Sequence, residues 1–157
     1  MQRRSIIRGA AALLGAASLA TPIIGLTQTK PLVEVWKTAT CGCCHEWVAH
    51  LEANGFQVKT HDISDMAKEA QRRQLGLADK FASCHTALIG GYVLEGHVPA
   101  REIRRLLKER PKALGLAVPG MTVGSPGMDG PAYAGRKDPY AVLLVQRDGG
   151  SSVYQSY

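Results

Sequence analysis

The sequence of 157 residues contains no apolar run long enough to span a bilayer. The candidate run, residues 9–20, consists only of Gly, Ala, Leu and Ser, whereas a transmembrane helix needs ~20 apolar residues. The sequence also lacks a concentrated tract of lysine and arginine outside Arg101–Lys112, which has the pattern of a solvated helix face. A permanent membrane anchor and nucleic-acid binding are therefore not expected.

The start of the chain has the pattern of an export signal. Three arginines, two of them the adjacent Arg3 and Arg4, precede the short apolar run, as in a signal peptide. The arginine pair resembles the twin-arginine signal. We predict a twin-arginine-type signal peptide at 1–29 and a single domain at 30–157, located in the periplasm. Removing the signal subtracts three arginines and no acids from the formal charge of +6, which leaves a mildly basic domain of +3.

Cysteine is scarce, and its distribution is the strongest signal in the chain. Three of the four cysteines, Cys41, Cys43 and Cys44, stand within one turn of backbone, and Cys84 follows some forty residues later. A disulfide needs Cα atoms about 4.4–6.8 Å apart and suitably aimed side chains, so adjacent Cys43 and Cys44 could bridge only with strain. Three thiols this close cannot all be bridged within the chain. Because disulfides persist in exported proteins, these cysteines remain thiolates only if metal protects them or if they cycle between thiol and disulfide. Metal binding or thiol redox chemistry is therefore the leading hypothesis.

Hydrophobic periodicity predicts alternating strands and helices from Leu32 onward. The expected elements are, in chain order, a strand at Leu32–Trp36, a helix from Cys43 or Cys44 to Asn54, a strand at Phe56–His61, a helix at Met66–Leu75 capped by Ser64 or Asp65, strands at Thr86–Ile89 and Tyr92–Glu95 joined by Gly90-Gly91, and a helix at Pro99–Glu109. This order, β-α-β-α-β-β-α, is that of thioredoxin-like α/β proteins. It places the cysteine cluster at the carboxyl edge of the first strand, where open α/β sheets hold their sites.

The last third of the chain departs from this small unit. Residues 114–132 are rich in glycine and proline, contain Met121 and Met128, and have no sustained period, so they predict a long loop. Beyond it, Tyr140–Gln146 and Ser151–Tyr157 flank a turn of Asp and two glycines and predict a C-terminal β-hairpin.

These segments together resemble a known family, the small exported copper-resistance proteins of the CopG type. The resemblance covers nearly all of residues 32–146 and depends on four segments in order: Trp36–Cys44, Ser83–Thr86, Glu95–Pro99 and Pro119–Met128. It implies a thioredoxin-like fold and periplasmic copper handling through a Cys-x-Cys-Cys turn and a distant cysteine. It further implies a multinuclear, thiolate-bridged copper centre that changes oxidation state, with periplasmic copper-export or copper-oxidising proteins as partners.

The chemistry of the cysteines agrees with this resemblance. Soft thiolate and thioether ligands favour Cu(I), and a helix N-terminus lowers the pKa of a thiol and so stabilises the metal-binding thiolate. Thioredoxins have a cis-proline near the position of Cys84, but this chain has none between Ser83 and Ala87. A fourth sulfur is thereby brought within reach of the first helix. We predict that Cys41, Cys43, Cys44 and Cys84 bind copper.

Other side chains are weaker candidates for the same site. Met121 and Met128 could be outer copper ligands or ordinary packing residues, and His85 is a candidate because it neighbours Cys84. We assign the other histidines and both tryptophans to structural or surface positions outside the site: His45 on the surface, His97 in a turn, His50 and His61 as structural residues, and Trp36 and Trp47 in the core.

Several alternatives remain open at this point. A thiol-disulfide oxidoreductase would use Cys41 and Cys44 as its reactive pair, with Cys43 incidental. A structural disulfide could join Cys41 to Cys84. Four cysteines could also form a closed zinc site, although three sulfurs within four residues fit a bridged cluster better, and the usual iron–sulfur spacings are absent. Interconversion of Cu(I) and Cu(II) would make the protein a copper oxidoreductase, and the sequence does not decide whether it is an enzyme.

Overall fold

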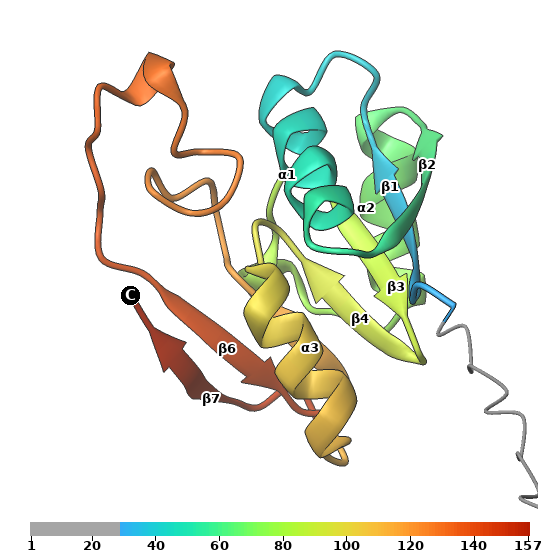
Figure 1. Cartoon of the computed structure of the whole chain (residues 1–157). Coiled ribbons are helices and arrows are strands. Elements are labelled where there is room, and N and C mark those ends of the chain that lie inside the picture. Colours follow the sequence, from blue (N-terminus) through green and yellow to red (C-terminus); the bar gives the residue numbers. More distant parts are fainter. Residues whose placement is uncertain (1–28) are drawn as a thin grey trace, which may run out of the picture.

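The computed structural model describes residues 29–157 (Figure 1). The predicted signal peptide lies outside the described residues, apart from its last position. Within the described part of the chain, no helix combines the length and hydrophobicity that a membrane span requires.

The domain is a mixed α/β structure. Among residues 29–157 the helices are α1 (Gly42–Ala53), α2 (Asp65–Gln74) and α3 (Ala100–Glu109), with short 3-10 turns at Asp79–Phe81 and Pro131–Tyr133. The strands are β1 (Leu32–Lys37), β2 (Gln57–Asp62), β3 (Thr86–Ile89), β4 (Tyr92–Glu95), β5 (Gly115–Ala117), β6 (Ala141–Val145) and β7 (Ser151–Ser156).

All seven strands of the described chain form one sheet, in the order β2-β1-β3-β4-β5-β6-β7. The pairs β1–β2 and β4–β5 are parallel, and the others are antiparallel. Helices α1 and α3 cover one face, where Trp47, Leu51 and Ile103 belong to one buried cluster. The opposite face is covered by α2 and the turn that follows it, where Leu77 and Phe81 belong to a second cluster. The central strands β3, β4 and β5 are almost fully buried between these layers, and they support the loops at the edge of the sheet.

Local signals in the sequence predicted most of these elements well. The Ser64 hydroxyl accepts a hydrogen bond from the Ala67 N–H, which confirms Ser64 as the cap of α2. The chain leaves α1 at Asn54 and Gly55, as predicted. The hairpin strands β3 and β4 have the predicted bounds, with Ile89 opposite Tyr92. The C-terminal hairpin is also confirmed.

The predicted long loop is partly wrong, because its first residues form strand β5. This strand pairs in parallel with β4, with Gly115 opposite Val93 and Ala117 opposite Glu95. A side chain at Gly115 would overlap the Val93 carbonyl, so only glycine permits this close approach. A segment of only three residues, one of them glycine, carries almost no local signal for a strand. The strand exists because β4 and β6 pair with it on either side.

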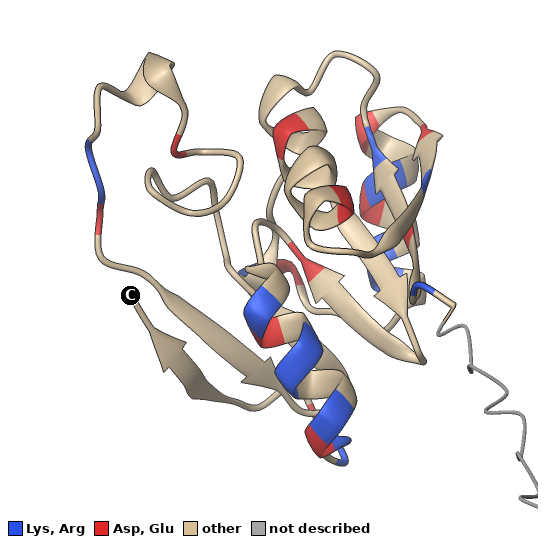
Figure 2. Ribbon diagram, viewed as in Figure 1, with Lys and Arg blue, Asp and Glu red and all other residues tan. Residues whose placement is uncertain are grey.

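The assignment of Trp36 to the core is wrong, whereas the assignment of the basic stretch to the surface is confirmed. Trp36 is half-buried and stacks on the His61 ring with 5.4 Å between ring centroids. It belongs to the sheet face opposite Val33 and Val35 because side chains alternate along β1. The basic stretch does form a solvated helix face on α3 (Figure 2). Arg105, for example, is bonded to Glu109 one turn away.

Candidate metal centre

Strand register brings four chain segments to one edge of the sheet. Trp36 near the end of β1 lies opposite Thr86 at the start of β3, and Thr86 lies opposite Glu95 at the end of β4. Glu95 in turn lies opposite Ala117 at the end of β5. The segments that continue from these strand ends therefore meet, and they contain the Cys-x-Cys-Cys turn, Cys84, His97 and the loop with both methionines.

The first helix positions three of the cysteines. Cys41 is the N-cap of α1 and makes no side-chain capping bond, while Cys44 is fully buried one turn into the helix. A disulfide joins Cys41 to Cys44, and Cys43 and Cys84 are free thiols. The alternative bridge between Cys41 and Cys84 is not formed.

Sulfur atoms from two separate segments converge at this point. The Cys43 sulfur lies 3.6 Å from that of Cys41 and 3.8 Å from that of Cys84. The sulfurs of all four cysteines lie within 4.8 Å of one another. The structure thus brings together the four residues that the sequence analysis selected as ligands, in a form in which two of them are oxidised.

Cys84 is held in place by its neighbours on the sheet. The Glu95 carboxylate accepts hydrogen bonds from the Ser83 N–H at 2.7 Å and from the Thr86 hydroxyl at 2.6 Å, so it ties together the two sides of the Cys84 turn. Lys68 of α2 donates to the Cys84 carbonyl at 3.2 Å. Burial raises the pKa of Glu95 to about 7 despite these hydrogen bonds.

Two buried histidines lie against the Cys84 sulfur. His85 Nδ1 is 3.3 Å away and His97 Nε2 is 3.0 Å away. The His85 ring packs on Trp47, with 4.3 Å between centroids, which confirms Trp47 as a core residue beside the cluster. Burial is the largest influence on both imidazoles and lowers the pKa of His85 well below its ordinary range and that of His97 to a lesser degree. Both rings are therefore neutral near pH 7, the form that binds metals.

His97 is the site residue that the sequence analysis missed, because it was assigned to a turn. The strand register of the β3–β4 hairpin could have revealed its position. The two-residue turn fixes Thr86 opposite Glu95, and extending that register by two residues places His97 opposite Cys84. The assignments of two other histidines hold: His45 is exposed, and His50 is structural, since its Nε2 accepts a hydrogen bond from the Ala100 N–H at the start of α3.

The methionine loop (residues 118–140) packs on the cysteine helix. Gly127 lies so close to α1 that a Cβ there would be 2.7 Å from the Cys43 carbonyl oxygen and 2.8 Å from the backbone nitrogen of Trp47. Its φ of +87° also favours glycine. Met128 is buried, and its sulfur accepts a hydrogen bond from Tyr133 at 3.1 Å.

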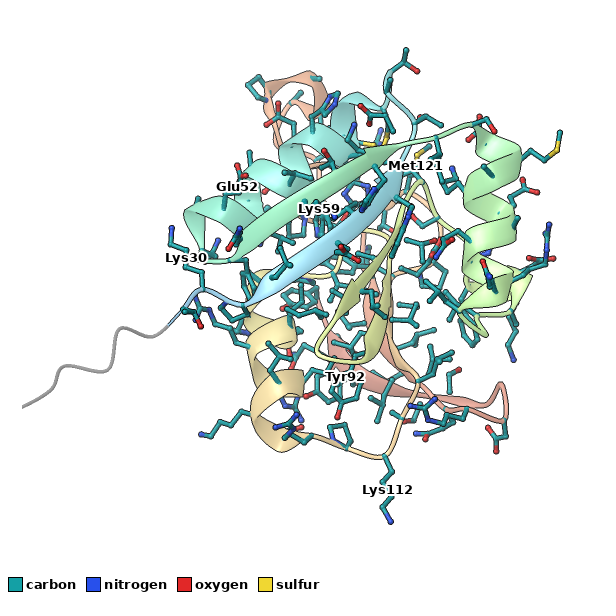
Figure 3. The ribbon with its side chains drawn as sticks, turned by 90° about the vertical axis from the view of Figure 1, so that its right-hand side faces the viewer. Lys30, Glu52, Lys59, Tyr92, Lys112 and Met121 are labelled. Carbon is teal, nitrogen blue, oxygen red and sulfur yellow. A yellow bond between two sulfur atoms is a disulfide. The ribbon has the colours of Figure 1, made fainter. Side chains whose placement is uncertain are left out.

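Met121 is placed differently from Met128. It is 58% exposed and follows Gly120, which bonds to Ser83 and Ala82 beside the Cys84 turn. Figure 3 shows Met121 near the end of β1 that leads into α1, far from Lys112 at the opposite end of the sheet. Of the two methionines, Met121 has its thioether at the surface, whereas the Met128 sulfur already has a partner.

The donor atoms define which ions the centre suits. The two groups of residues with metal-ligand spacing in the described chain are Cys41, Cys43, Cys44 and Cys84, and Cys84, His85 and His97. Neither group contains a carboxylate, so neither suits Mg²⁺ or Ca²⁺, which prefer oxygen ligands. Thiolate and imidazole favour copper or zinc, and a set of four sulfurs favours Cu(I) in particular.

Two solved structures resemble this chain over almost the whole domain. One, described as "Copper resistance protein copG- Form 2", is 44% identical with a TM-score of 0.74, and the match covers 82% of this chain and 98% of that chain. The other, "Copper resistance protein copG- Form 1", is 46% identical with a TM-score of 0.73 and the same coverage. The chain belongs to the CopG family of copper resistance proteins. The resemblance recognised in the sequence is therefore confirmed, and the cysteine cluster of this CopG family member is a centre capable of holding metal.

Residues 81–128, which include Cys84 and His97, match a family described as "Protein of unknown function, DUF411". A search of curated proteins finds no match.

The metal-free protein is expected to lose stability as the pH rises above 9. Burial, and next the nearby Cys43 sulfur, raise the pKa of the Cys84 thiol from its ordinary 9.0 to about 12. Between these values the unfolded chain releases this proton while the folded chain keeps it. The free energy of unfolding then falls by at most about 1.4 kcal/mol per pH unit. Denaturant unfolding from about pH 8 to about pH 11 measures the slope.

The control for this measurement is Cys84→Ser, which removes one titrating thiol and leaves every tyrosine and lysine in place. Its free energy of unfolding should fall less steeply with pH. Equal slopes for the two proteins would show that the Cys84 thiol titrates normally in the folded state.

Proposed function

We propose that this protein is a periplasmic copper-binding protein for copper resistance. In this proposal Cys41, Cys43, Cys44 and Cys84 hold Cu(I) or Cu(II) in a thiolate centre that takes more than one ion. The elements from β1 to α3 form a thioredoxin-like unit that positions the centre, and the methionine loop covers it. The bound copper is sequestered, relayed to periplasmic copper-export or copper-oxidising proteins, or interconverted between oxidation states.

The observation that carries this proposal is the convergence of sulfurs from two segments. Four sulfur atoms within 4.8 Å of one another, three from the start of α1 and one from the turn before β3, form a soft-ion ligand set. The copper resistance described for the two similar structures agrees with that chemistry. The Cys43 sulfur lies under 4 Å from the sulfurs of both Cys41 and Cys84, which supports a bridging role for it in this proposal.

The test is the copper content of the reduced protein. Wild-type protein loaded with Cu(I) under anaerobic conditions should hold more than one copper per chain, and Cys43→Ser should lose more than one ion because a bridging sulfur serves two. Metal analysis and electron paramagnetic resonance of protein purified from a copper-fed periplasm would check the location and oxidation state. Unchanged stoichiometry in Cys43→Ser would refute bridging, and an absence of bound copper in the wild-type protein would refute the function.

The disulfide between Cys41 and Cys44 supports a second candidate, a thiol-disulfide oxidoreductase. Cys41 is partly exposed and Cys44 is buried, so Cys41 is the sulfur that a substrate thiol could reach. Reduction of insulin disulfides by the metal-free protein would separate the two functions. This candidate predicts activity that survives Cys43→Ser and disappears in Cys41→Ser.

A further inference from the structure

We propose that Cys84, His85 and His97 form a second copper site that stays available while the Cys41–Cys44 disulfide is closed. The inference rests on the proposed function and deepens it, since the two sites share the Cys84 sulfur. The predicted ligand is a single copper ion held by one thiolate and two imidazole nitrogens.

The positions of the three donor atoms support this site. The Cys84 sulfur, a His85 nitrogen and a His97 nitrogen lie within 4.8 Å of one another, with sulfur-to-nitrogen distances of 3.3 and 3.0 Å. An ion bound at about 2.0 Å to nitrogen and about 2.3 Å to sulfur separates such ligand atoms by roughly 3.5 Å. Shifts of a few tenths of an ångström would therefore admit the ion.

The tautomer of His97 points its free lone pair at the site. Its Nδ1 lies 2.7 Å from the Pro126 carbonyl oxygen, which can only accept, so Nδ1 carries the proton. Nε2 is then the unprotonated nitrogen, and it faces the Cys84 sulfur. A histidine fixed by a backbone carbonyl on one nitrogen while the other faces the ion is the usual arrangement in metal sites. The carbonyl comes from the methionine loop, so that loop orients the proposed ligand.

His85 also points a ring nitrogen at the Cys84 sulfur. Its side chain is fully buried, and Nδ1 is the nitrogen that lies 3.3 Å from that sulfur. A neutral imidazole has one unprotonated nitrogen, so Nδ1 can bind an ion in the tautomer that carries the proton on Nε2. The backbone and the packing on Trp47 therefore already hold this ring in a position to coordinate.

The disulfide does not consume any of these three donors. Closing Cys41–Cys44 removes two of the four sulfurs from the thiolate centre and leaves Cys84 free, with both histidines in contact with it. One thiolate with two imidazoles is the in-plane ligand set of blue-copper sites, which hold copper in both oxidation states. The oxidised protein therefore keeps one copper site of mixed sulfur and nitrogen ligands.

The test uses the full chain with Cys41, Cys43 and Cys44 all changed to Ser, which leaves only the proposed site. This variant should bind one Cu(II) per chain, and one Zn²⁺ as a redox-inert probe. X-ray absorption of the zinc form should show one sulfur and two imidazole nitrogens. Adding His97→Gln should lower zinc affinity by more than about 100-fold, since even outer-shell changes cost 10–100-fold. Adding His45→Gln, an exposed histidine beside Cys44, should leave affinity unchanged.

Each outcome decides the inference. A zinc first shell without sulfur, or equal affinity with and without His97→Gln, overturns it. The absorption measurement needs no histidine substitution, so it remains decisive if His97→Gln fails to fold. If this variant binds no metal while the reduced wild-type protein binds several coppers, the second site is wrong and the proposed function stands. If neither protein binds copper, both are wrong.

Discussion

Cys84→Ser is expected to abolish tight copper binding in both the reduced and the oxidised protein. Its sulfur is the one donor common to the four-cysteine group and the Cys84, His85 and His97 group. Without it, the trio on α1 has no partner from the second segment, and the two histidines have no thiolate. The affinity for Cu(I), measured by competition with a chromophoric chelator, should fall by more than about 100-fold.

Cys41→Ser is the matched comparison for this variant. It also removes one sulfur and prevents the disulfide, but it leaves Cys84, His85 and His97 untouched. Its copper content should fall without reaching zero, and one ion should remain. If Cys84→Ser and Cys41→Ser lose the same amount of copper, Cys84 has no special position and the convergence of the two segments has no functional meaning.

Reduction of the Cys41–Cys44 disulfide should at least double the copper capacity of the protein. The oxidised chain has two free thiols, Cys43 and Cys84, so reduction should bring the number titrated under denaturing conditions from two to four. A disulfide sulfur is no longer a thiolate and binds metal poorly. Copper per chain should therefore rise from one to more than one when a phosphine reductant is added before anaerobic loading.

Cys44→Ser provides the control for reduction, because it cannot form this disulfide. Its copper content should not respond to the reductant. Equal copper content in the oxidised and reduced wild-type protein would mean that the disulfide does not limit binding. In that case the four cysteines would not act as one ligand set.

Local sequence signals were sufficient for most of the fold but not for all of it. Helix α2 has a serine cap and a glycine after its end, and the hairpin of β3 and β4 has a two-residue glycine turn, so these elements were predicted from their own residues. Strand β5 has no comparable signal. It depends on pairing with β4 and β6, which are distant in sequence, and such tertiary pairing overrides local propensity.

The residues of the candidate site also divide into those with a signal in the local sequence and those whose role depends on contacts between distant segments. Cys84 was recognised because a fourth sulfur is chemically conspicuous and precedes a strand. His97 was missed because a histidine before a proline has an ordinary explanation as a turn residue, and its proximity to Cys84 appears only through the register of the hairpin. The sequence also could not show that Met128 is buried against Tyr133 while Met121 is exposed, since both lie in similar Gly/Pro surroundings.

The methionine loop begins and ends on neighbouring strands of one sheet. Leu116 of β5 lies opposite Leu144 of β6, so the sheet holds both ends of the loop firmly together. Lengthening a loop whose ends are already fixed costs little free energy, and surface connections tolerate insertions and exchanges. Relatives could therefore acquire different outer ligands or docking contacts by exchanging this segment alone, and a protein engineer could graft new donors above the cysteines without redesigning the scaffold.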